Sequence, residues 1–215
     1  MKFSFERSVW SYTKVQALRS AVVRDRFMNR KTAGLYLDVG CGWNVHPQNI
    51  NLDYAWRPGI DIVCDIRRGI PLPDQYVIGI FTEHCLEHIS LRDCLFVLSE
   101  CRRVLRPGAY LRIVVPDLEI YIQQYVGHRP MPYADDDLVD DLYSPAMSIN
   151  RIMRAHGHQF IYDFLTLQKL LTAVGFIEVK KCSFGESSDP GLALDTPERK
   201  TESLYVEARR QTIPV

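Results

Sequence analysis

The chain has 215 residues and a mass of 24.8 kDa, enough for one well-packed domain but too short for two full ones. Lys and Arg total 26, as do Asp and Glu, so no net charge would draw the chain to nucleic acid or to an anionic membrane. The sequence contains no run of about 18 apolar residues, so no membrane-spanning helix is predicted. Its first residues lack the apolar core of a signal peptide.

The six cysteines are scattered along the chain, and no two of them form a C-x-x-C pair. Their positions are typical of reduced, mostly buried thiols and argue against a disulfide framework or a zinc site. We therefore expect a cytoplasmic protein.

Residues 1–34 mix aromatic and basic side chains. Val15, Leu18, Val22 and Val23 follow helical spacing, which predicts an N-terminal helical lid or brace. Acidic residues interrupt the basic cluster that begins at Arg24, so we interpret it as a solvated helix face and not as a nucleic-acid patch.

Four apolar runs follow, and each is predicted to be a parallel strand that ends at an acidic residue. The runs cover residues 35–39, 50–54, 60–66 and 76–81, and their acids are Asp38, Asp53, Asp65 and Glu83. Because the carboxyl ends of parallel strands meet at one edge of a sheet, we expect the four acids to share one rim.

The first run stops at Gly40-Cys41-Gly42, where the two glycines permit a tight turn and a close approach by a ligand. A dinucleotide fingerprint would place a third glycine at position 45 and an acid about 20 residues later. Position 45 is Val, and Asp53 follows Gly42 by only eleven positions. The first crossover is therefore a loop or a single turn, which counts against NAD.

The second half of the chain begins with a helix capped by Ser90 and Asp93, which ends at Arg106-Pro107-Gly108 and leads into a strand over 109–115. Asp163 is predicted to cap a further helix that ends at Gly175. The runs 176–179 and 203–208 predict an antiparallel pair of strands at one edge. The loop 183–202 between them is long for a hairpin, so it is either mobile or part of a substrate pocket.

Residues 118–160 interrupt this alternation. A short helix over 118–126 is followed by the acidic residues Asp135–Asp137, and His156-Gly157-His158 closes the segment. Insertions at the carboxyl rim commonly hold the substrate site. We predict a single domain over residues 1–215, with a lid (1–34), an α/β core with a Rossmann-like, doubly wound, mostly parallel sheet (35–117 and 161–215) and a cap (118–160).

Together these motifs resemble those of class I S-adenosylmethionine-dependent methyltransferases. The resemblance lies in Leu37–Gly42, Asn51–Asp53, Val63–Asp65, Pro71–Pro73, Glu87-His88, Arg103–Gly108 and Leu170–Phe176. These motifs occur in the family's order over roughly residues 35–180. The compact stretch from Gly40 to Asp53 is similar to a bacterial subgroup associated with sugar and cell-surface polysaccharide metabolism.

The resemblance implies S-adenosylmethionine as the cofactor and a set of residues that bind it. Gly40 and Gly42 would let the backbone approach the methionine moiety and the ribose, and Cys41 and Asn44 belong to the same turn. Asp38 would stand near the ammonium group and Asp53 would bind the ribose hydroxyls. Asp65 and Ile66 would face the adenine, and Thr82 and Glu83 would lie beneath the methionine end of the cofactor.

Two features depart from the family's pattern. Trp43-Asn44 replaces the third glycine of the turn, so residues 43–46 must take a different path around the cofactor. Ile78-Gly79 stands where the fourth strand commonly carries an acid.

Methyl transfer needs a positioned nucleophile and sometimes a general base, for which His84, His88, His156 and His158 are the candidates. We select His158 and His88 as catalytic, with a structural or pocket-lining role as the alternative for each. His156 and His158 with Asp135–Asp137 match no strong ligand motif, so no metal site is predicted.

The sequence thus predicts a methyltransferase that acts on an oxygen of a small molecule, a sugar or glycan precursor, with neither nucleic acid nor membrane as a partner. Two alternatives stay open. The first is an N-methyltransferase for a small amine or a protein side chain, and the second is a non-catalytic module that binds S-adenosylmethionine or a nucleotide sugar. The oligomeric state is left undetermined.

Overall fold

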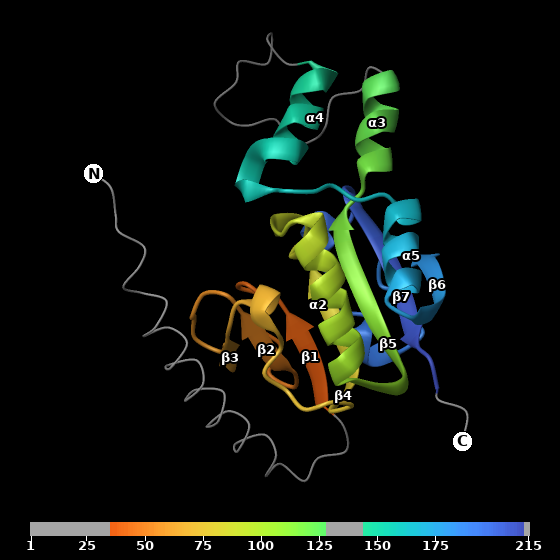
Figure 1. The fold of residues 1–215 in the computed structure, drawn as a ribbon. Coiled ribbons are helices and arrows are strands. Elements are labelled where there is room, and N and C mark those ends of the chain that lie inside the picture. The colour runs from red at the N-terminus through yellow and green to blue at the C-terminus, as the bar shows by residue number, and fades with distance from the viewer. Residues whose placement is uncertain (1–34, 128–143, 213–215) are drawn as a thin grey trace.

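A computed structural model describes residues 35–127 and 144–212, which form a seven-stranded sheet with helices against it (Figure 1). The order of the strands is β3-β2-β1-β4-β5-β7-β6, and β7 alone runs antiparallel to its neighbours. The strands are β1 (Leu35–Val39), β2 (Ile50–Asp53), β3 (Ile62–Val63), β4 (Val77–Glu83), β5 (Leu105–Pro116), β6 (Phe176–Cys182) and β7 (Ser203–Arg210). The predicted α/β fold with a mostly parallel sheet is confirmed. The lid predicted over residues 1–34 and the acids Asp135–Asp137 lie outside the described residues.

The connection from β1 to β2 contains neither helix nor strand, as the short crossover predicted. The backbone N–H groups of Gly40 and Cys41 both donate to the carbonyl of Leu52, at 2.8 and 3.2 Å. These bonds hold the turn against β2. The acids that end β1 and β2 are therefore close neighbours at the carboxyl edge.

The third strand is shorter than the run 60–66 predicted. The carboxylate of Asp61 accepts a hydrogen bond from the backbone N–H of Asn51 at 3.0 Å. Asp65 caps the 3₁₀ helix η2 (Ile66–Arg68) by accepting from the backbone N–H of Arg67. These side-chain bonds compete with the strand ladder at both ends of the run. Only Ile62 and Val63 remain paired with β2.

The helix α2 (Leu91–Val104) begins at Ser90 as predicted. The Ser90 hydroxyl accepts from the N–H of Asp93 at 3.1 Å and donates to its carboxylate at 2.7 Å. β5 begins directly after α2, and the turn expected at 106–108 lies within it, where the register with β4 shifts and Gly108 has a φ of +81°. The other helix of the core, α5 (Phe164–Ala173), is capped by Asp163, and Gly175 follows it with a φ of +88°.

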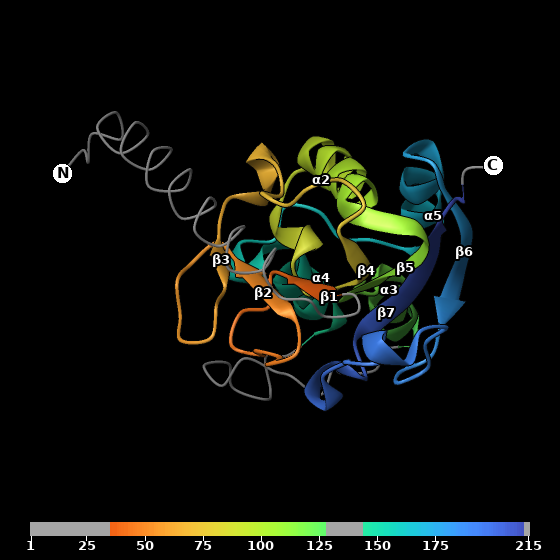
Figure 2. The same ribbon diagram turned by 90° about the horizontal axis from the view of Figure 1, so that it is seen from below.

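The two faces of the sheet are covered differently (Figure 2). On one face, α2 and α5 pack against alternate residues of the strands, such as Leu37, Ile80 and Leu111. On the opposite face, the described residues that cover the sheet belong to loop 183–202, where Leu192 packs on Phe81 and Tyr205. This loop carries the 3₁₀ helices η6 (Pro190–Leu192) and η7 (Pro197–Arg199).

A small cap projects beyond the carboxyl edge of the sheet (Figure 1). It consists of α3 (Leu118–Val126), α4 (Pro145–Arg154) and the 3₁₀ helix η5 (Ala155–Gly157), within the segment expected as an insertion. Tyr121 of α3 and Ile152 of α4 pack together with Ile161. The cap therefore stands over the rim at which the acids gather. None of the described helices is long and apolar enough to cross a membrane.

A buried arginine fixes loop 183–202 to the sheet. Arg112 of β5 is fully buried, and its guanidinium makes a two-pronged bond to Asp195, with Nε–Oδ1 at 2.7 Å and Nη2–Oδ2 at 2.6 Å. Its remaining N–H groups reach Glu207 of β7 and the carbonyls of Ser183 and Glu186. All five donors of the guanidinium are used, as burial of a charge requires.

We expect Arg112→Met to lower the free energy of unfolding by about 3–5 kcal/mol, because it leaves the carboxylates of Asp195 and Glu207 buried without their cation. Urea denaturation measures the change. Glu178→Ala is the control, since it removes the exposed partner of an ion pair to Arg209 at 3.1 Å and is expected to cost at most about 1 kcal/mol. Equal midpoints for the two variants would contradict the prediction.

Candidate active site

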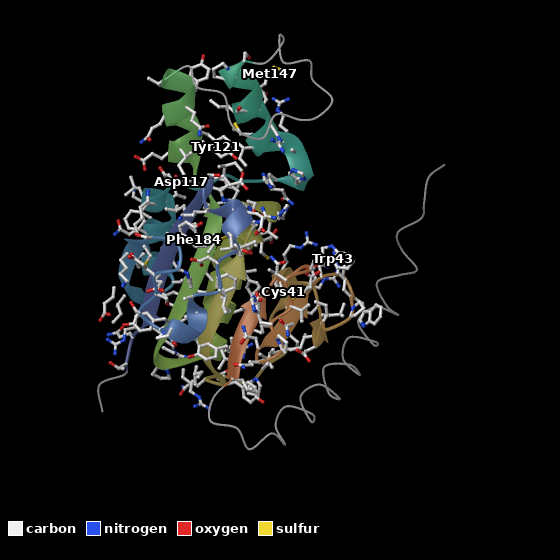
Figure 3. The ribbon with its side chains drawn as sticks, turned by 180° about the vertical axis from the view of Figure 1, so that it is seen from behind. Cys41, Trp43, Asp117, Tyr121, Met147 and Phe184 are labelled. Carbon is white, nitrogen blue, oxygen red and sulfur yellow. The ribbon has the colours of Figure 1, made fainter. Side chains whose placement is uncertain are left out.

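Two cavities lie at the carboxyl edge of the sheet and meet at His84 and His88. The rim cavity has a volume of about 410 Å³ and is lined by Gly40, Gly42, Leu52, Asp53, Tyr54, Cys64, Asp65, Ile66, Arg67, His84, Cys85, His88 and Ile89. The cap cavity has a volume of about 780 Å³ and is lined by Asn44, His84, His88, Pro116, Tyr121, Ser148, Arg151, Ile152, His156, His158, Thr196, Glu198, Arg199 and Glu202. Figure 3 shows Cys41 and Trp43 at the end of β1 and Tyr121 on the cap.

Asp53 ends β2 inside the rim cavity and organises the turn above it. One carboxylate oxygen accepts from the backbone N–H of Gly42 at 2.9 Å. The other accepts from the N–H of Ala55 at 2.8 Å and from Arg57 at 3.0 Å. The acid thus locks the glycine turn in place while its side chain still borders the cavity.

Asp65 faces the same cavity and is paired with Arg67. The guanidinium of Arg67 donates to both carboxylate oxygens, each at 2.9 Å. Burial alone would raise the pKa of Asp65, but the hydrogen bonds and the charge of Arg67 outweigh it and hold the pKa below the ordinary value. Asp65 is therefore an ionised acceptor beside the apolar side chains of Ile66 and Ile89.

The two glycines of the turn differ in what a side chain at each position would meet. Both have positive φ angles, +74° at Gly40 and +57° at Gly42. A β-carbon at Gly40 would lie 2.4 Å from Cys85 Sγ, so packing within the protein already fills that space. A β-carbon at Gly42 would meet no atom of the described residues within 4 Å. Gly42 is thus the position where the bare backbone borders open space.

Four of the residues that were predicted to bind the cofactor are absent from the lining of both cavities. Asp38, Cys41 and Thr82 are buried behind the rim, and Glu83 points into loop 183–202. Burial, with smaller effects from Glu83 and Asp53, raises the pKa of Asp38 well above its usual range. Its nearest basic group is His46, at 3.7 Å. The roles assigned to these four residues stay predictions.

Glu83 and Asn44 both bind Thr196 of loop 183–202. The Glu83 carboxylate accepts from the backbone N–H of Thr196 at 2.9 Å and from its hydroxyl, and the Asn44 amide donates to the same hydroxyl at 3.0 Å. Asn44 therefore lies in the cap cavity and not in the rim cavity. These bonds connect the glycine turn to the loop that forms one wall of the cap cavity.

The histidines gather where the cavities join. His84 has no free ring nitrogen: Nδ1 accepts from Arg199 at 2.7 Å and Nε2 lies 2.8 Å from the Ser203 hydroxyl. Burial, with the charge of Arg199, lowers the pKa of His84 to about 2. His84 is thus a poor general base. The rings of His88 and His158 are in edge contact, with centroids 4.8 Å apart.

Several residues that line the two cavities were not predicted from the sequence. Arg151 of α4 and Arg199 of η7 contribute cationic groups to the cap cavity, and Arg67 and Tyr54 line the rim cavity. Arg67 follows Asp65 by two residues, so its pairing could have been inferred from the sequence. Arg151 and Arg199 lie in segments whose path depends on tertiary structure.

The sequence model of a family described as "Methyltransferase domain" matches residues 42–113, which run from the glycine turn through β5 to Ile113. No curated protein matches the chain. The family match covers 72 of the 215 residues and identifies this part of the chain as a methyltransferase domain.

The fold agrees with solved methyltransferase structures. A SAM-dependent methyltransferase from Archaeoglobus fulgidus is 18% identical, with 91% of this chain and 94% of that chain covered and a TM-score of 0.51. A protein from Thermotoga maritima described as a possible histamine N-methyltransferase is 14% identical, with 96% and 98% covered and a TM-score of 0.54. A methyltransferase from Mesorhizobium loti is 18% identical, with 88% and 96% covered and a TM-score of 0.50.

The rim cavity fits S-adenosylmethionine. It offers open space at Gly42, the carboxyl groups of Asp53 and Asp65 for hydroxyl and amino groups, and the apolar walls of Leu52, Ile66 and Ile89 for a flat ring. When bound, the cofactor supplies a methyl group on a positively charged sulfonium sulfur. Asp53 and Asp65 are the residues that would hold its polar groups, as the sequence analysis proposed.

The two glycines provide a matched pair of variants. We expect Gly40→Ala to lower the free energy of unfolding by about 2–4 kcal/mol, because its β-carbon collides with Cys85. Gly42→Ala is expected to cost only about 1 kcal/mol, from its positive φ alone, yet to weaken binding of S-adenosylhomocysteine about tenfold or more. Thermal unfolding and calorimetry separate the two effects. If both variants lost stability equally, the difference in packing would be refuted.

We expect Asp53→Ala to weaken binding of S-adenosylhomocysteine by about 10- to 100-fold, because it removes a charged acceptor and the bond that orients Gly42. Calorimetry measures the affinity. Glu178→Ala, at the far edge of the sheet, removes an exposed carboxylate and serves as the control. Unchanged affinity in Asp53→Ala would exclude this acid from the cofactor site.

Proposed function

We propose that this enzyme transfers a methyl group to an oxygen of a small hydroxylated molecule, a sugar or glycan precursor, bound in the cap cavity. The observation that carries the proposal is the junction of the two cavities at His84 and His88. An acceptor in the cap cavity can approach a methyl donor in the rim cavity through this junction, and an in-line displacement requires the two to meet.

The chemistry of the cap cavity favours a polar acceptor. Its lining combines imidazole, hydroxyl, carboxylate and guanidinium groups from α4, η5 and loop 183–202. Such donors and acceptors suit a molecule with several hydroxyl groups. The two arginines, Arg151 and Arg199, further favour an acceptor with an anionic group such as phosphate or carboxylate.

His88 and His158 are the residues that we propose to receive the proton of the acceptor hydroxyl. Burial, followed by the charge of the neighbouring histidines, lowers the pKa of His88 below its ordinary value. Burial also lowers the pKa of His158. Both imidazoles are therefore neutral at physiological pH, which is the form that accepts a proton.

Transfer of a labelled methyl group tests the proposal. The enzyme is incubated with methyl-labelled S-adenosylmethionine and with a panel of sugar phosphates, nucleotide sugars and, as the alternative class, small amines. We expect label on the hydroxylated anionic compounds. Label on amines alone would overturn the proposal in favour of N-methylation. S-Adenosylhomocysteine binding without transfer to any compound would overturn the assigned acceptor class.

Arg151→Gln tests the anionic acceptor group. We expect the KM for the acceptor to rise about tenfold or more while the affinity for S-adenosylhomocysteine stays unchanged, since Arg151 lines the cap cavity and not the rim cavity. Arg154→Gln is the matched control. Arg154 lies one turn further along α4, is exposed and does not line the cap cavity. An equal rise in KM for the two variants would refute the role of Arg151.

A further inference from the structure

Three side chains with metal-binding groups meet at the junction of the cavities. Glu87 and His88 belong to the 3₁₀ helix η3 (Leu86–His88), directly after β4, and His158 follows η5 at the base of the cap. One candidate ligand atom from each residue lies within 4.8 Å of the other two. The cluster therefore joins the sheet to the cap.

Within the part of the chain that the structure describes, the carboxylate of Glu87 has no hydrogen-bond partner. Its side chain is fully buried, and neither oxygen accepts a hydrogen bond among the described residues. One oxygen lies 3.4 Å from His84 Nδ1 and 3.9 Å from His88 Nε2. His84 Nδ1 already accepts from Arg199, so it has no proton to give to Glu87. A buried acid in this position needs a proton or a cation to offset its desolvation.

His158 is held in the tautomer that binds a metal. Its Nδ1 lies 2.6 Å from the carbonyl oxygen of Ile152, and only a protonated nitrogen can make that bond. The lone pair is therefore on Nε2. A ligating histidine typically donates its other N–H to a carbonyl or a carboxylate in this way.

We propose that Glu87, His88 and His158 bind a divalent first-row transition metal of the Zn²⁺ or Mn²⁺ class. Two imidazoles and one carboxylate suit these ions better than Mg²⁺ or Ca²⁺, which prefer oxygen ligands alone. With bonds of about 2.0–2.2 Å, ligand atoms around a tetrahedral ion lie roughly 3.3 Å apart, so the three side chains must close by about 1.5 Å.

The site would leave at least one coordination position for the acceptor. Three protein ligands are typical of metal sites that keep an open position. His88 and His158 both line the cap cavity, and His88 also lines the rim cavity. A metal at this place would bind an acceptor oxygen beside the cofactor cavity and lower the pKa of its hydroxyl, and the proton would then pass to water, because the metal-bound imidazoles of His88 and His158 could no longer accept it. This second part rests on the proposed function, whereas metal binding itself does not.

Mn²⁺ binding to the chelator-treated full chain tests the site. Mn²⁺ is chosen because it has little affinity for thiols, and the chain has six free cysteines. The loss of the electron paramagnetic resonance signal of free Mn²⁺ is expected to show one bound ion per chain. Zn²⁺ should displace it, and Mg²⁺ should not displace it at equal concentration. No binding of Mn²⁺, or equally tight binding of Mg²⁺, would overturn the proposal.

Two histidines of the same turn provide the matched variants. We expect His158→Gln to weaken Mn²⁺ binding by more than about 100-fold, a loss larger than is typical for an outer-shell partner. His156→Gln, whose ring lies 5.9 Å from that of His158 and is no candidate ligand, should leave binding unchanged. Equal losses in the two variants would refute the assigned ligand set.

Glu87→Gln addresses the buried carboxylate. We expect this variant to fold and to lose the rise in melting temperature that Mn²⁺ gives the wild-type protein. A rise that survived the substitution would exclude Glu87 as a ligand. Calorimetry with S-adenosylhomocysteine on the same metal-free samples keeps the two proposals separate, because cofactor binding without Mn²⁺ binding overturns only the metal site.

Discussion

The active site depends on the burial of one cation. Arg112 lies in the middle of β5, and its guanidinium bonds reach Asp195, Glu207 and two backbone carbonyls of loop 183–202. Those bonds hold the loop against the sheet, and the same loop brings Thr196 and Arg199 to the cap cavity. Thr196 then binds Glu83 and Asn44, and Arg199 binds His84. A charge on the opposite side of the sheet from α2 thus determines one wall of the pocket.

Much of the fold follows from short-range signals in the sequence. Apolar runs ending in acids located the parallel strands, and the caps Ser90 and Asp163 located the starts of α2 and α5. The errors arose where side chains compete with the backbone ladder. Asp61 and Asp65 bind nearby N–H groups and shorten β3 to two residues. The turn expected at Arg106–Gly108 is present as an irregularity within β5, because the register with β4 jumps from Val77–Leu105 to Gly79–Tyr110 and Gly108 has a φ of +81°.

The candidate site could be predicted in part. Asp53, Asp65 and Gly42 line the rim cavity because each stands at the end of a parallel strand, a position that the sequence reveals. Gly40 was predicted to let a ligand approach the backbone, but the space that a side chain would take at this position is filled by Cys85. The group Glu87, His88 and His158 could not be found by spacing, because 70 positions separate its two histidines. Only the placement of the cap over the sheet brings them together.

The arginines beside the cofactor cavity bear on how the enzyme turns over. Asp53 is paired with Arg57 and Asp65 with Arg67, so each acid meets its ligand with its charge already balanced. The methyl donor is a cation, whereas the molecule left after transfer has lost that charge. A cavity with balanced charge distinguishes weakly between the two. We therefore expect the spent cofactor to bind about as tightly as the fresh one and to compete with it for the cavity.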